Sequence, residues 1–165
     1  MDYNWNEISW IFESDGTLRD LYVKDVTIED WKSFVDFLNE NFNVRFGPVD
    51  ERRRKIDKDF VVDYLTNQNE DSESQTISII LEDLLINCFL FSQTEIELDI
   101  EPSEIKSSFE LDELIDFMKS ISTHLKKPII LTGENQIEFP LVTIDSKNQM
   151  FKYLTESDAR KLLEK

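Results

Sequence analysis

Residues 95–101 constrain the fold of this chain more than any other segment. Ile96, Leu98 and Ile100 alternate there with four acidic residues. Because successive side chains of a β-strand point to opposite faces, this pattern predicts a half-buried strand. One face of it packs on a core, and the other carries a row of carboxylates. We therefore expect an α+β protein with a mainly antiparallel sheet.

Other segments supply further strands and helices. Apolar spacing predicts two amphipathic helices, which we expect on one face of the sheet, and the first of them follows a capping threonine, Thr27. A turn at residues 14–16 predicts that the first two strands form a hairpin. Strands are expected at 8–13, 18–23, 43–46, 76–81, 84–91, 95–101, 129–132, 137–144 and 149–154. Helices are expected at 28–41, 50–65, 110–126 and 156–165.

The order of these elements suggests an internal repeat. A wholly polar run at 67–75 divides the chain into halves 1–66 and 76–165, and each half reads as hairpin, helix and short strand. Residues 34–38 and 114–118 are similar at an offset of 80. The sequence therefore predicts one domain over 1–165 with a possible duplicated ββαβ unit, and chance similarity between two amphipathic helices is the alternative.

The charge of the chain disfavours several classes of partner. The sequence holds 35 acidic and 18 basic residues, a formal net charge of −17, while 40% of its residues are hydrophobic. Such a surface repels nucleic acids and anionic membranes. We see no secretion signal, no apolar run of the ~20 residues that span a bilayer, and a single cysteine, Cys88. We expect a soluble, cytoplasmic protein.

Residues suited to catalysis are scarce. His124 is the only histidine, and Cys88 lies in an apolar strand, so we expect neither a Cys/His pair nor a zinc site. Three glycines are too few for a phosphate-binding loop. Carboxylate pairs have little diagnostic value among so many acids. We expect no enzyme activity, metal or cofactor, with a carboxylate-based or metal-dependent hydrolase as the alternative.

The acidic residues are concentrated in one stretch. Between Glu82 and Met118 there are eleven acidic residues and one basic residue, a net charge of −10. A ladder of like charges costs stability, so we interpret it as a docking surface for a basic protein, with plain solubility as the alternative. The basic run 52–55 is expected to be solvated surface or a contact for acidic groups. The predicted partner-binding residues are Glu95, Glu97, Asp99, Glu101, Glu104, Asp112 and Glu113.

In size, charge and fold class the chain resembles small acidic bacterial immunity proteins that are encoded beside toxins. The segment WNEISWIFESDGTLRDLYV also looks like that of a small bacterial family. The resemblance to immunity proteins rests on no shared motif, so it assigns no role to any individual residue of this chain. It implies a non-catalytic protein that binds and neutralises a basic toxin or enzyme. A structural homo-oligomer, such as a homodimer, is a further alternative.

Overall fold

An eight-stranded antiparallel sheet forms the centre of the molecule, and its strand order is β2-β3-β4-β5-β1-β6-β7-β8. A computed structural model describes residues 2–48, 51–67 and 75–165. The strands are β1 (Arg19–Lys24), β2 (Asn43–Gly47), β3 (Thr76–Ile80), β4 (Leu85–Phe89), β5 (Glu95–Ile100), β6 (Ile129–Gly133), β7 (Pro140–Asp145) and β8 (Met150–Tyr153). The helices are α1 (Trp5–Ile8), η1 (Ser9–Phe12), α2 (Ile28–Asn41), α3 (Lys58–Thr66), η2 (Pro102–Glu104), α4 (Ser108–Leu125) and α5 (Glu156–Leu163), where η denotes a 3-10 helix. The predicted α+β class is confirmed.

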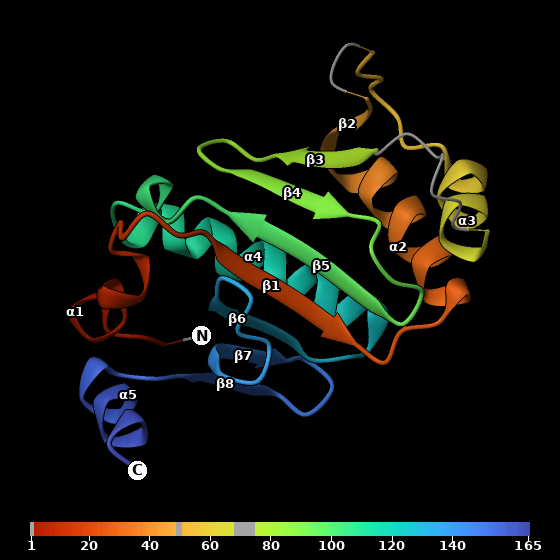
Figure 1. Cartoon of the computed structure of the whole chain (residues 1–165). Helices are drawn as coiled ribbons and strands as arrows, with labels where there is room; N and C mark the ends of the chain where they lie inside the picture. Colours follow the sequence, from red (N-terminus) through yellow and green to blue (C-terminus); the bar gives the residue numbers. More distant parts are fainter. Residues whose placement is uncertain (1, 49–50, 68–74) are drawn as a thin grey trace.

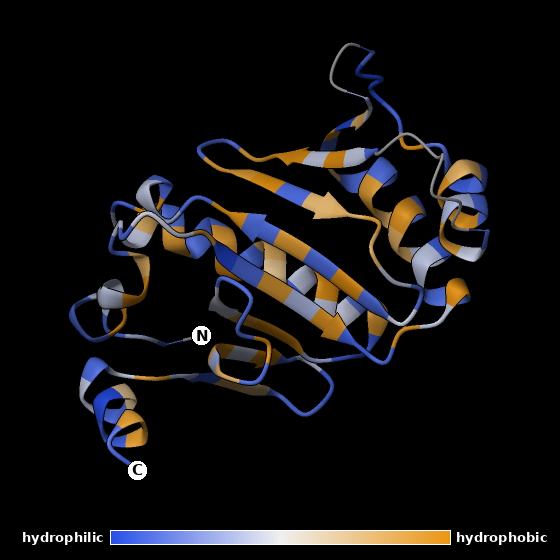
Figure 2. Ribbon diagram, in the orientation of Figure 1, coloured by the Kyte–Doolittle hydropathy of each residue, from blue (hydrophilic) through white to orange (hydrophobic). Residues whose placement is uncertain are grey.

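The two long helices cover one face of the sheet (Figure 1). Helix α2 begins at Thr27, whose side chain accepts from the backbone of Asp30 while the Asp30 carboxylate accepts from Thr27 in return. Helix α4 has 18 residues and packs on β6 and β7. Their apolar sides and the alternate residues of the strands form one core, in which Trp31 and Phe34 are fully buried. Figure 2 shows hydrophilic and hydrophobic residues interspersed along β1 and β5. Because Leu21, Ile96 and Leu98 are buried in the core, the polar residues between them point to the opposite side of the sheet, which we term the open face.

Both long helices are crossover connections between strands that run in the same direction. Helix α2 joins β1 to β2 across three intervening strands, and α4 joins β5 to β6 across β1. As a result β1 lies between β5 and β6, so strands from the two halves of the chain alternate at the centre of the sheet. A duplicated unit is not confirmed, because β2 ends at the edge of the sheet whereas β6 lies beside β1.

The predicted N-terminal hairpin is wrong. Residues 5–12 form α1 and η1 rather than a strand. Asn4 caps this segment, since its side chain accepts from the backbone N–H of Asn6. Ile8, Ile11 and Phe12 are the buried residues, and this i, i+3, i+4 spacing is helical. The alternation of apolar residues at 8, 10 and 12 suggested a strand only because both periods fit so short a run.

The other predicted elements are confirmed with small shifts of their ends, except at 50–65. There the helix begins only at Lys58, after an Asp57 cap. The preceding basic run folds back on the sheet edge, where Arg53 and Phe46 form a bridge. Gly47 permits this return because its φ is +125° and a Cβ there would lie 2.6 Å from the Glu51 carbonyl oxygen. Most of the predicted loop 67–75, residues 68–74, lies outside the described residues.

Candidate functional site

Strand β5 places three of the predicted carboxylates on the open face. Ile96, Leu98 and Ile100 are buried against the helices, so Glu95, Glu97 and Asp99 point the other way. Glu95 and Glu97 are half-buried, whereas Asp99 is 9% exposed. These three residues and Asp20, which lies directly opposite Asp99 on β1, are called the acidic cluster below.

A row of polar residues crosses the open face through this cluster. Arg52 donates from Nη2 to Ser78 Oγ, and Ser78 donates to Asn87 Oδ1 over 3.1 Å. Asn87 Nδ2 donates in turn to Asp99 Oδ1 over 3.3 Å. The row continues to Asp20, the cross-strand neighbour of Asp99. The first arginine of the basic run is therefore linked to the acidic cluster through two neutral side chains, without contacting it directly.

Burial and like charge leave the acidic cluster electrostatically uncompensated. Burial raises the pKa of Asp99 to about 6, and the charges of Asp20 and Glu134 add to this increase against the opposing hydrogen bond from Asn87. Burial also raises the pKa of Glu97, helped by the charges of Asp20, Glu95 and Asp99. A cation brought beside these groups would favour their ionised forms and lower both pKa values.

No lysine or arginine in the described ranges forms an ion pair with the acidic cluster. The six ion pairs there use other carboxylates, all of them on helices or in the loop before β1. Lys24 lies opposite Glu95 in the register of β1 and β5, yet the pair is not within ion-pair distance. Within the described ranges, the negative charge of the acidic cluster is therefore not balanced by an ion pair.

The remaining predicted carboxylates do not join the acidic cluster. Glu101 is exposed just beyond the end of β5. Glu104 accepts from the backbone of Leu85 over 2.9 Å, and Asp112 accepts from the Tyr3 hydroxyl over 2.7 Å. Glu113 accepts from the backbone of Glu82 over 2.6 Å. These last three accept hydrogen bonds from other segments of the chain, so only Glu95, Glu97 and Asp99 of the predicted set gather on the open face.

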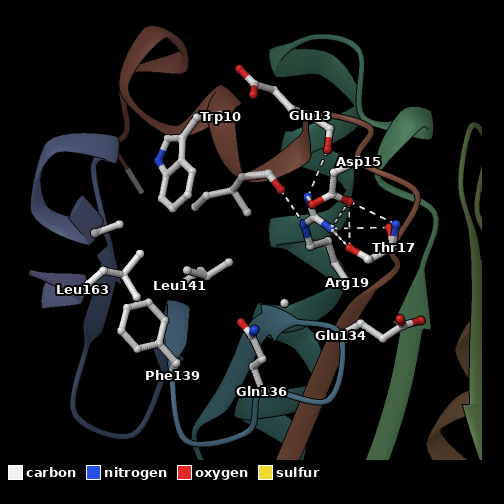
Figure 3. A pocket seen from close by; sticks show the side chains of 13 residues that line it. Trp10, Glu13, Asp15, Thr17, Arg19, Glu134, Gln136, Phe139, Leu141 and Leu163 are labelled. Carbon is white, nitrogen blue, oxygen red and sulfur yellow. Dashed lines mark hydrogen bonds and ion pairs between the residues drawn. The ribbon is translucent and has the colours of Figure 1, made fainter.

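A cavity of about 630 Å³ lies where β1 begins and β6 ends, with Arg19 and Gly133 among its lining residues. Figure 3 shows that its walls differ in character. Trp10, Phe139, Leu141 and Leu163 form an apolar side, while Glu13, Asp15, Thr17, Arg19, Glu134 and Gln136 form a polar side. Its lining residues come from η1, the loop that follows it, β1, the turn between β6 and β7, β7 and helix α5. Neither Glu97 nor Asp99 is among its lining residues.

Arg19 organises the polar side of the cavity. Its side chain is 6% exposed, and Nε donates to the Ile11 carbonyl over 2.6 Å while Nη2 donates to the Glu13 carbonyl over 3.0 Å. Nη1 forms an ion pair with Asp15 at 3.3 Å. Hydrogen bonds from Thr17 and Arg19 lower the pKa of Asp15 to about 2. Because its donors are engaged by the protein, Arg19 fixes the loop rather than offering a free charge.

The turn between β6 and β7 connects the cavity to the acidic cluster. Asn135, which has a φ of +58°, donates from its backbone N–H to Asp20 Oδ2 over 2.7 Å. Tyr22 donates to the same carboxylate oxygen over 3.0 Å. Glu134 lines the cavity and also contributes to the raised pKa of Asp99. Cavity and cluster are therefore neighbours on one surface.

Sequence reasoning missed Asp20, Arg19 and Glu134. Asp20 and Arg19 lie in a strand that was predicted, and alternation from Leu21 could have placed Asp20 on the open face. No local sequence pattern predicts that the turn carrying Glu134 folds back beside Asp20 and Arg19. His124 occupies the last turn of α4 as predicted, where Nε2 lies 2.7 Å from the Ser33 hydroxyl.

Three further observations in the described part of the chain concern the cysteine, metal binding and membrane crossing. Cys88 is fully buried, and burial raises the pKa of its thiol. No group of three or more His, Cys, Asp and Glu residues in ranges 2–48, 51–67 and 75–165 is arranged to hold a metal ion. Within those ranges no helix is both long and apolar enough to cross a bilayer.

Comparisons with family models, curated proteins and solved structures give no significant match.

Proposed function

We propose that this chain is a non-catalytic binding protein whose open face receives a basic region of a partner protein. The most concrete form of this function is that of an immunity or inhibitor protein, which neutralises a basic toxin or enzyme. The observation that supports the proposal is the acidic cluster: four carboxylates on neighbouring central strands, with no lysine or arginine of the described chain paired to them.

The energetics of the cluster favour a docking role over a structural one. Like charges at cross-strand positions destabilise a sheet, and the raised pKa values of Glu97 and Asp99 mean that ionising these groups is less favourable in the folded protein than in water. A partner that supplies lysine or arginine removes this penalty on binding. Such complementarity accelerates encounter and fixes orientation.

The test is binding of a basic partner by charge-reversed protein. The double variant Glu95→Lys/Glu97→Lys is measured with the product of the adjacent gene, by co-expression and by titration calorimetry. A control, Glu40→Lys/Glu82→Lys, makes the same change in net charge at two exposed positions away from the cluster. Circular dichroism checks that both variants fold.

We expect the cluster variant to lose at least about tenfold in affinity, because cross-interface charge pairs contribute on the order of 1.5 kcal/mol or more. The control should lose much less, since it alters only long-range attraction. Equal losses in the two variants would show that overall charge, and not the acidic cluster, governs association. Unchanged binding by both variants would refute the proposal.

A carboxylate-based hydrolase is the second candidate function. It is favoured by one observation, the raised pKa of Asp99 beside a second carboxyl group, Asp20, because such pairs are typical of acid–base catalysis. Asp99→Asn distinguishes the two candidates. If the chain is a hydrolase, the natural protein should hydrolyse an ester or glycoside substrate and Asp99→Asn should abolish that activity. If the chain is a binding protein, the natural protein should hydrolyse neither substrate, and Asp99→Asn should weaken partner binding.

A further inference from the structure

The cavity beside the acidic cluster is large enough to receive a bulky side chain together with part of the segment that carries it. Its volume of about 630 Å³ falls in the range of pockets that bind small ligands. Trp10, Phe139 and Leu163 border it on one side (Figure 3). Leu163 is 78% exposed, so apolar surface remains in contact with water there. Covering that surface is favourable for any occupant that is itself apolar.

The charges around the cavity restrict what that occupant can carry. Glu13 and Glu134 are exposed and have no ion-pair partner in the described part of the chain. Asp15 and Arg19 neutralise each other. The rim is therefore negative, and the acidic cluster continues the same sign on the far side of Asn135. An anionic ligand would be repelled along this whole surface, whereas a cationic one would be attracted.

We infer that the cavity receives a bulky apolar side chain from a basic segment of the partner, whose flanking lysine or arginine residues lie over Glu134 and the acidic cluster. This inference rests on the proposed function and adds the anchor to it. A buried apolar side chain surrounded by charged contacts is the usual anatomy of an energetic centre in protein interfaces. The acidic cluster then supplies attraction and orientation, and the cavity supplies most of the specificity.

The experiment uses three synthetic pentapeptides and the full-length protein. The first has four lysines around a central phenylalanine, the second replaces that phenylalanine by serine, and the third has four glutamates around phenylalanine. Binding is followed by NMR through the indole N–H of Trp10, which donates to the Leu154 carbonyl over 3.1 Å beside the cavity. The indole N–H of Trp31, bonded to Ser92 in another part of the fold, is the internal reference.

We expect the lysine–phenylalanine peptide to bind at least about tenfold more tightly than its serine counterpart, because burying a phenylalanine side chain is worth that factor or more. It should shift the Trp10 signal and leave the Trp31 signal unchanged. The glutamate peptide should bind more weakly than either lysine peptide. Raising the salt concentration should weaken both lysine peptides.

Two variants separate the cavity from the charge. Ala159→Leu fills the cavity from the buried position that α5 presents to it, and should remove the advantage of phenylalanine over serine. Glu13→Gln/Glu134→Gln keeps the shape of the rim and should weaken both lysine peptides. Its control is Glu40→Gln/Glu82→Gln, which removes the same charge elsewhere. The glutamine variants keep the test valid even if Ala159→Leu disturbs α5.

The outcomes distinguish this inference from the proposed function. Equal binding of the two lysine peptides, with affinity still lost in Glu95→Lys/Glu97→Lys, would overturn the anchor and leave the docking function standing. Equal binding of the glutamate and lysine phenylalanine peptides at the Trp10 signal would overturn the assignment of a basic partner to the cavity. An unchanged Trp10 signal with all three peptides would overturn the anchor as well.

Discussion

Asp99→Asn removes one charge from the acidic cluster while keeping the size and shape of the side chain. Asp99 is 9% exposed and accepts one hydrogen bond, from Asn87. An asparagine can accept the same bond through its own carbonyl oxygen. The substitution therefore isolates the cost of a negative charge at the centre of the open face, which is the physical basis of the proposed function.

The magnitude follows from the pKa of the carboxyl group. Burial, with the charges of Asp20 and Glu134, raises it from 3.8 to about 6. At about 1.4 kcal/mol per pH unit, ionised Asp99 costs the folded state at most about 3 kcal/mol. Solvent screening on an open sheet face reduces this to about 1–2 kcal/mol. Because the folded protein holds the proton more tightly than the unfolded chain, this penalty is absent below about pH 4 and complete above about pH 6.

Urea unfolding followed by tryptophan fluorescence, from about pH 4 to about pH 8, measures this effect through the unfolding free energy. At neutral pH we expect Asp99→Asn to be about 1–2 kcal/mol more stable than the natural protein, with a melting temperature raised by roughly 2–8 °C. The gain should vanish near pH 4. Glu101→Gln, at an exposed position just beyond the same strand, is the control of equal charge. An equal gain in both variants, or a gain that does not depend on pH, would refute the reasoning.

Three further predictions concern the parts of the fold that hold the site. Arg19→Met leaves the Ile11 and Glu13 carbonyls without their hydrogen-bond donor and should lower the unfolding free energy, measured by urea unfolding, by about 2–4 kcal/mol. The control Arg160→Met removes an exposed ion pair and should change the unfolding free energy by less than about 1 kcal/mol. His124→Ala removes the contact with Ser33 between α2 and α4 and should cost about 1–2 kcal/mol by thermal unfolding, so an unchanged melting temperature would contradict this role. Cys88 is fully buried with a raised pKa and should react with a thiol reagent only after unfolding; fast labelling in native buffer would argue against a closed core.

The local sequence pattern predicted the secondary structure correctly in segments where a single periodicity of apolar residues dominates. The alternation from 95 to 101 predicted β5, its buried side and its carboxylate side. Helix α2 has the bounds expected from its apolar spacing, since the Thr27 cap is a signal contained in neighbouring residues. In both cases the interactions that decide the structure join residues that are close in sequence, and these are the interactions that periodicity reports.

The local sequence pattern predicted the wrong secondary structure where the same apolar residues fit both the strand and the helix periodicity. Residues 8–12 alternate like a strand, yet Ile8, Ile11 and Phe12 are the residues that become buried. The choice depends on the surface against which the segment packs, and Arg19 contributes to it by binding the Ile11 carbonyl. The possible repeat is not confirmed, because similar helices do not fix where the following strand enters the sheet.

For the site, the sequence determined that a strand of this sheet would present Glu95, Glu97 and Asp99 to one side, because strand geometry alternates side chains irrespective of what surrounds them. Only the tertiary structure decided that Asp20 would lie opposite Asp99, that three other carboxylates would serve as internal hydrogen-bond acceptors, and that a cavity would form beside the cluster. Each of these features depends on pairing or packing between segments that are far apart in the chain. The crossover helices and the strand register bring those segments together, and local residue spacing does not predict such contacts.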